Sequence, residues 1–332
     1  MAKRKYYMTL DTETATLPFA NEIAKGNAKA KQNIAIAKPL VYDIGWVITD
    51  RQGNIIDTKN YLVQETFFVP NVFNTAYYCD KRPIYMKLLE KGEIVPKTWN
   101  EIVDILVSDL EKVDILCAYN SCFDFKRAIP FTERYIKHLY SADYNEWEKK
   151  QKTKCQDIAN NGKFNGGNPD YLKPFLELRG KKYPTADLWG ISCDRLININ
   201  KYRNFCLENE YLTQSVQYFK SSAETAFQYL LNQHDFVEEH TALSDALIES
   251  QILTKALKKG AVKEYVKAFP FRELGTSFRY VDEGHIGKEK RKKYKKILKE
   301  ALRDYIAVNE GEMKADLGNK YWKRMVNILE SL

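Results

Sequence analysis

Short apolar runs in the N-terminal part of the chain have the length and residue types of β-strands. Residues 5–11 form the first run, residues 41–48 the second and residues 55–63 the third, with turn residues at 51–54 between the last two. We therefore predict a meander of three strands. Residues 14–40 separate the first two strands; they are rich in Ala, Lys and Asn, and we expect a loop there.

Helical spacing begins after residue 97. Thr98 and Glu101 have the spacing of a capping box, and the apolar positions that follow are Ile102, Ile105, Leu106 and Leu110. Residues 113–118 then predict a short buried strand, and a further helix is expected to begin near Asp124. Residues 222–231 and 241–257 also have helical patterns.

Two regions interrupt this alternation. Residues 140–184 are polar, and we expect an insertion with little regular structure; residues 185–188 then form the last short strand. Beyond residue 258 an apolar stripe at helical spacing recurs in residues 288–306, with lysines on the opposite face. We predict an α/β domain over residues 1–258, with helices on a mixed sheet, and a basic helical extension over residues 259–332.

Acidic residues stand at the ends of the predicted strands. Asp11 and Glu13 are two residues apart, so on a strand both carboxylates point to one face. Asp124 follows another strand, and His240 and Asp245 precede or open a helix. Carboxylates of this kind suit Mg²⁺ or Mn²⁺, and a histidine suits a base working at neutral pH. Each signal alone also fits an exposed acidic pair, a helix N-terminal acid or a surface histidine.

Charge is distributed unevenly along the chain. The net charge is +8, but residues 255–332 hold 20 basic and 11 acidic side chains, so residues 1–254 carry −1. A basic segment is typical of proteins with a polyanionic partner, although a solvated helical face is equally basic. Six scattered cysteines without a C-x-x-C pair, and only four histidines, argue against a zinc site and favour reduced thiols in the cytoplasm. We find no signal peptide or membrane-spanning stretch in the sequence.

Taken in order, the acidic segments resemble the motifs of the DEDDh exonucleases of the ribonuclease H-like superfamily, which include polymerase proofreading subunits, ribonuclease T and oligoribonuclease. Residues 11–14 (Asp-Thr-Glu-Thr) resemble the first motif, residues 118–124 (Ala-Tyr-Asn-Ser-Cys-Phe-Asp) the second, and residues 240–245 (His-Thr-Ala-Leu-Ser-Asp) the third. The resemblance covers roughly residues 5–258. Tyr119 departs from it, standing where a histidine is common. The small-residue pattern and compact insertions look most like phage-encoded members.

The resemblance implies a ribonuclease H-like mixed sheet of five strands flanked by helices, and a 3′→5′ exonuclease that uses two Mg²⁺ or Mn²⁺ ions. It implies metal ligands at Asp11, Glu13, Asp124 and Asp245, and a general base at His240. Residues implied to contact the substrate are Thr12, Thr14, Leu17 and Asn120. The expected substrate is single-stranded nucleic acid with a free 3′ end, DNA more than RNA.

Three questions stay open from the sequence. It does not reveal contacts near a 2′-hydroxyl, so RNA remains an alternative to DNA as the substrate. A nucleic-acid-binding or partner-recruiting protein with a vestigial nuclease site is the alternative, because the basic C-terminal segment suits such a role. The retention of all five catalytic-type residues argues against it. A partner protein from replication or recombination fits either reading, and the sequence does not choose one.

Overall fold

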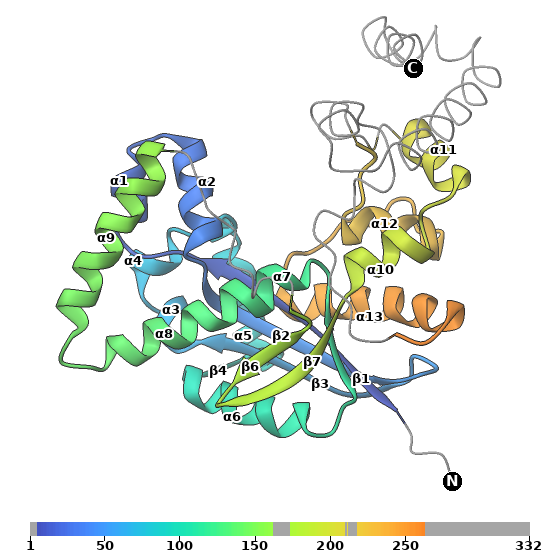
Figure 1. Ribbon diagram of the computed structural model, residues 1–332, viewed down its shortest axis with the longest axis horizontal. Coiled ribbons are helices and arrows are strands. Elements are labelled where there is room, and N and C mark those ends of the chain that lie inside the picture. Colours follow the sequence, from blue (N-terminus) through green and yellow to red (C-terminus); the bar gives the residue numbers. More distant parts are fainter. Residues whose placement is uncertain (1–4, 162–172, 210, 212–217, 263–332) are drawn as a thin grey trace, which may run out of the picture. The chain divides into compact units, whose positions relative to one another are not determined.

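The computed structural model describes residues 5–161, 173–209, 211 and 218–262. Seven strands form one mixed sheet in the order β4-β3-β2-β1-β5-β7-β6 (Figure 1). Their bounds are β1 Tyr6–Ala15, β2 Leu40–Asp50, β3 Ile55–Val63, β4 Val95–Lys97, β5 Ile115–Ala118, β6 Phe175–Leu178 and β7 Lys181–Asp187. The predicted α/β class is therefore confirmed, but the expected count of five strands is wrong.

The sheet begins as the predicted meander and continues in parallel. Strand β2 pairs antiparallel with β1 and with β3, whereas β5 pairs parallel with both β1 and β7. The two strands beyond the predicted five, β4 and β6, are three and four residues long and lie at the edges of the sheet. Strand β4 contains a proline and β6 lies in the polar stretch 140–184, so neither segment stood out as a strand in the sequence.

Helices connect the strands. They are α1 Ala20–Ala24, α2 Ala28–Ala37, α3 Gln64–Phe67, α4 Pro70–Phe73, the 3₁₀-helix η1 Cys79–Lys81, α5 Arg82–Lys91, α6 Trp99–Leu110, α7 Ser121–Phe123, the π-helix η2 Asp124–Ala128, α8 Ile129–Leu139, α9 Tyr144–Asn161, α10 Leu188–Arg195, α11 Asn200–Glu208, α12 Ala223–Leu231 and α13 Ala242–Lys259. The capping box opens α6 as predicted. None of the described helices is both long and apolar enough to span a membrane.

Two predicted irregular regions contain helices instead. Residues 14–40 hold α1 and α2, and residues 140–184 hold the 18-residue α9 together with β6 and part of β7. Helices α1, α2 and α9 contact one another, and Figure 1 shows them standing together beyond the end of β1. Mutual packing therefore stabilises two short helices and one, α9, whose own sequence is mostly polar.

The chain divides into two compact units. The first contains the sheet and residues 237–262, and the second contains the described helices of residues 189–236. The predicted boundary at residue 258 stays a prediction, because the helical stripe at 288–306 lies outside the described residues. Every candidate catalytic residue belongs to the first unit.

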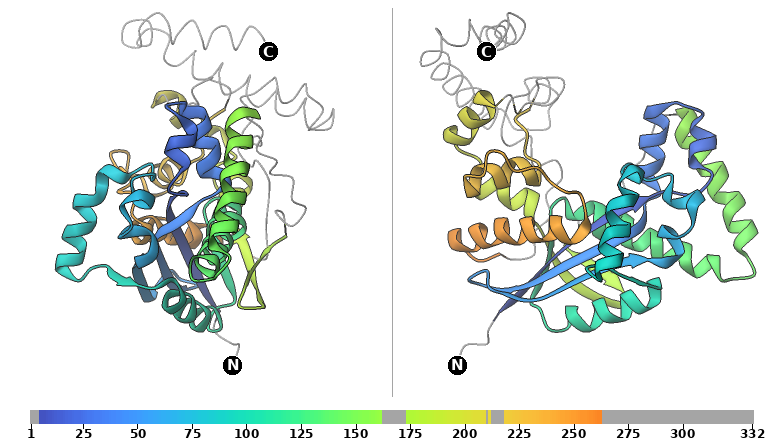
Figure 2. Two further views of the ribbon diagram at one scale, coloured as in Figure 1. Left: turned by 90° about the vertical axis from the view of Figure 1, so that its left-hand side faces the viewer. Right: turned by 180° about the vertical axis from the view of Figure 1, so that it is seen from behind.

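Helices α6 and α13 cover opposite faces of the sheet. The neighbours Gly45 and Trp46 on β2 point to opposite sides, since side chains alternate along a strand. The Trp46 indole N–H donates to Asp109 of α6 at 3.1 Å, whereas the Gly45 Cα lies against the first residues of α13. The right-hand view of Figure 2 shows the sheet between the two helices.

Replacing Gly45 by Ala is expected to destabilise the fold. An added Cβ would lie 2.4 Å from the backbone nitrogen of Leu243, and backbone cannot rotate away as a long side chain can. We expect a loss of about 2–3 kcal/mol in the free energy of unfolding, measured by urea titration. Gly92→Ala is the matched control, because nothing lies within 4 Å of its Cβ and only its φ of 70° opposes the change. An equal effect of the two variants would contradict this packing.

Candidate functional site

Strands β1 and β2 place three carboxylates on the face covered by α13. Asp11 is paired with Gly45 and Glu13 with Asp43, and directly paired residues on neighbouring strands share a face. Gly45 has no side chain, so the start of α13 can approach β2 directly beside Asp11. The small residue and the acidic residues are thus parts of one arrangement.

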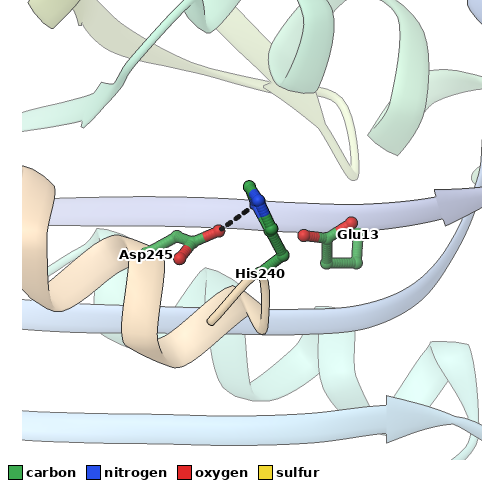
Figure 3. A group of neighbouring side chains, drawn as sticks. All are labelled: Glu13, His240 and Asp245. Carbon is green, nitrogen blue, oxygen red and sulfur yellow. Dashed lines mark ion pairs between the residues drawn. The ribbon is translucent and has the colours of Figure 1, made fainter. Parts of the chain in front are cut away.

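Helix α13 contributes Asp245 and Glu249, which are one turn apart and face the same way. His240 lies two residues before the helix, as predicted, with a left-handed φ of 54° that is uncommon for a non-glycine residue. Its Nδ1 is 3.9 Å from Asp245 Oδ2 and 3.7 Å from Glu238 Oε2. Figure 3 shows Glu13, His240 and Asp245 together, reaching one place from β1 and from the start of α13.

Asp43 holds the first turn of α13 from the neighbouring strand. The N-cap residue Thr241 makes no side-chain capping bond. Instead the Ala242 N–H donates to Asp43 Oδ2 at 2.8 Å, and the Tyr85 hydroxyl donates to the same oxygen at 2.9 Å. A carboxylate on a helix N-terminus satisfies an otherwise unpaired N–H and is favoured by the helix dipole. Asp43 therefore sets where His240 and Asp245 stand over β1.

The turn after β5 is held by two further acids. The Tyr119 N–H donates to Glu249 Oε2 at 3.0 Å. The N–H groups of Asn120 and Ser121 both donate to Oδ1 of Asp187, the last residue of β7, at 3.2 and 3.3 Å. These bonds fix the entry to η2, whose first residue is Asp124.

Asp124 reaches β1 through Thr12. The Thr12 hydroxyl donates to Asp124 Oδ1 at 2.6 Å across 112 residues of sequence. Both side chains are buried. The bond ties the second predicted motif to the first, and Asp124 is among the charges that raise the pKa of both Asp11 and Glu13.

Burial and mutual repulsion raise the pKa values of the clustered acids. For Asp11 and Glu13, burial is the largest cause; repulsion from Asp124 follows for Asp11, and repulsion from Asp245 for Glu13. Burial also raises the pKa of Asp124 to about 7, although the bond from Thr12 lowers it. The pKa of Asp245 rises to about 6 from burial.

The two acids that the sequence analysis did not select behave in the same way. Burial raises the pKa of Asp43 to about 7, against the lowering effect of its bonds from Ala242 and Tyr85. Burial and then repulsion from Asp124 raise the pKa of Glu249 well above its usual range. Ionising all of these acids together is therefore unfavourable in the folded protein.

Tyr78 and Lys81 border the cluster on the side of His240. The Tyr78 ring stacks on the His240 imidazole, with centroids 4.5 Å apart and an interplanar angle of 15°. The Lys81 Nζ lies 4.6 Å from the centre of the Tyr78 ring and donates to the Glu239 carbonyl. Its positive charge lowers the pKa of both Glu13 and Asp245. These contacts hold the loop before α13 in place.

The residues present fit divalent metal. Glu13, His240 and Asp245 each offer a ligand atom, and these atoms all lie within 4.8 Å of one another. Asp11 and Asp124 lie outside this group of three, but Asp124 is close enough to raise the pKa of both Asp11 and Glu13. A bound dication would offset the repulsion between carboxylates that raises their pKa values. Oxygen ligands favour Mg²⁺ or Mn²⁺. The imidazole is close enough to serve as a ligand as well as a base.

The predicted substrate contacts differ in accessibility. Thr14 is half-buried, and Asn120 is exposed with a left-handed φ of 65°. Thr12 is engaged by Asp124, and Leu17 is fully buried in the core, which leaves no exposed surface for a contact with a nucleotide. Of the four, Thr14 and Asn120 are therefore the side chains open to a ligand in this conformation.

Sequence reasoning missed four residues of the site. Glu249 had a usable signal, since it is four residues after Asp245 on a predicted helix and so lies on the same face. Asp43 had a weaker one, an acid within an apolar strand. Tyr78 and Lys81 had none, because only the tertiary fold brings them to His240.

Comparison with known proteins adds no relative. No family model matches this chain, and neither the curated proteins nor the solved structures give a match.

Proposed function

We propose that this protein is a metal-dependent 3′→5′ exonuclease of the DEDDh type, acting on single-stranded nucleic acid and on DNA more than RNA. One observation carries the proposal: acids from β1, η2 and α13, which are far apart in sequence, act on one another's pKa values beside a single histidine. The arrangement of strands supports it, since β3-β2-β1-β5-β7 combine a meander with parallel strands in one mixed sheet, which is the kind of sheet that the resemblance implies.

Each residue has a role in this proposal. Asp11, Glu13, Asp124 and Asp245 would hold two Mg²⁺ or Mn²⁺ ions, which when bound stabilise negative charge on the attacking and leaving oxygens. His240 takes the proton from the attacking water as its oxygen bonds to phosphorus and the P–O3′ bond breaks. The released O3′ takes up a proton from solvent, and a 5′-mononucleotide leaves. Its side chain is about a third exposed, so the proton can pass on to solvent.

Degradation of 5′-labelled single-stranded DNA and RNA of equal sequence, with Mg²⁺ or Mn²⁺, tests the proposal. Wild type is expected to give a ladder that shortens from the 3′ end, and His240→Ala to slow it by about 10²-fold or more, because a positioned base contributes about 10²–10⁴-fold. His234→Ala is the matched control, since this exposed histidine belongs to the second unit. A folded wild-type protein that cleaves neither polymer would refute the proposal.

The alternative is a nucleic-acid-binding protein with a vestigial site, which the charge of +9 on residues 255–332 favours. Binding without cleavage in the same assay, weakening steeply with salt, would support it.

A further inference from the structure

Tyr77 is an exposed aromatic residue beside the site. It exposes 85% of its surface, in the turn between α4 and η1. Its preceding neighbours are firmly held: Thr75 and Ala76 are buried, and the Thr16 N–H donates to the Thr75 hydroxyl at 2.7 Å. An exposed aromatic ring on a firmly held backbone is suited to stacking against an unpaired base.

Three rings run from this position to the acidic cluster. The Tyr77 and Tyr78 rings are in edge-to-face contact, with centroids 4.8 Å apart. Tyr78 in turn stacks on His240, which is 3.9 Å from Asp245. Tyr77 is therefore two ring contacts from the proposed base. Lys81 lies over Tyr78 and adds a positive charge of the kind that attracts a phosphate.

We propose that Tyr77 binds an unpaired nucleobase close to the 3′ end by stacking, and so places the terminal phosphodiester at the acidic cluster. The inference rests on the proposed function, and the feature of the substrate that Tyr77 recognises is the flat face of the base. Every base has a π-face, so the contact carries little sequence preference. In a duplex only the outer face of the terminal base pair is free, whereas the bases of a single strand can be splayed apart, so the contact also favours single strands.

Oligonucleotides carrying 2-aminopurine at each position near the 3′ end in turn test the inference. They are titrated with full-length protein carrying Asp11→Asn, so that the proposed cleavage cannot interfere. We expect quenching at one position. Tyr77→Ala should abolish that quenching and weaken binding by about 5- to 150-fold, the range that loss of one stacked base produces. Tyr77→Trp should preserve both.

Tyr140→Ala is the matched control, because Tyr140 is 70% exposed and follows α8. An abasic residue at the quenched position should weaken wild-type binding as much as Tyr77→Ala does, and the two changes together should cost no more than either one. Unchanged binding of Tyr77→Ala, or an equal loss in Tyr140→Ala, would overturn the inference.

The readout is binding, so it separates the two proposals. If wild type cleaves nothing but the quenching depends on Tyr77, base stacking stands and the exonuclease proposal fails. If wild type degrades single strands while Tyr77→Ala binds them normally, the stacking proposal alone fails.

Discussion

Asp11→Asn is expected to abolish metal-dependent degradation and yet to stabilise the protein without metal. Four other carboxylates of the cluster raise the pKa of Asp11 by repulsion, namely those of Asp124, Glu249, Asp245 and Glu13. The neutral amide replaces a carboxylate that we propose to ligate the metal, and losing several kcal/mol of transition-state stabilisation slows the reaction by about 10³-fold or more. The same change removes repulsion within the cluster, so the metal-free free energy of unfolding should rise by about 1 kcal/mol.

Two measurements on one sample check this pair of effects. The rate of degradation of single-stranded DNA with Mg²⁺ should fall, while the metal-free Tm at pH 8 should rise by about 2–4 °C. Asp104→Asn is the control, since Asp104 is an exposed acid of α6. Its Oδ1 lies 3.9 Å from Arg179 Nε, so the ion pair between them is weak. A variant that lost activity and stability together would indicate a structural role for Asp11 instead.

The stability of the metal-free protein is expected to fall as pH rises from about 4 through about 7. A carboxyl group with a raised pKa binds protons more tightly in the folded than in the unfolded chain, so ionisation costs the folded state more. For Asp245 the loss spans the interval from its ordinary value to about 6, and for Asp124 and Asp43 to about 7. Acids whose pKa is lowered by hydrogen bonds, such as Asp50, act in the opposite direction but below this range.

Thermal unfolding with chelator and with excess Mg²⁺ measures this dependence. With chelator the Tm should fall by at least about 5 °C between pH 5 and pH 8, since several groups contribute. With Mg²⁺ the Tm at pH 8 should be close to the Tm at pH 5, because the ion binds the ionised folded state and stabilises it by mass action. A Tm that is independent of pH and of Mg²⁺ would argue that the acids do not form a metal site.

The errors of sequence interpretation have a common cause. In α9 the buried positions are Trp147, Gln151 and Cys155, four residues apart, but the middle one is polar and hides the stripe. In α2 only Ala30 and Ile34 are buried, which is too little for an apolar periodicity. Both helices depend on packing against each other, so their local sequences could not predict them.

The sequence by itself determined the features that depend on near neighbours. These are the shared face of Asp11 and Glu13, the capping box of α6, and His240 standing just before a helix that carries Asp245, because strand and helix periods act over two to four residues. Only the tertiary structure decided the rest. Asp43 caps α13 across 199 residues, and Tyr78 reaches His240 from a separate turn. Contacts of this kind depend on how the sheet and its helices pack. A local pattern of residues cannot encode a contact between residues that are far apart in the sequence.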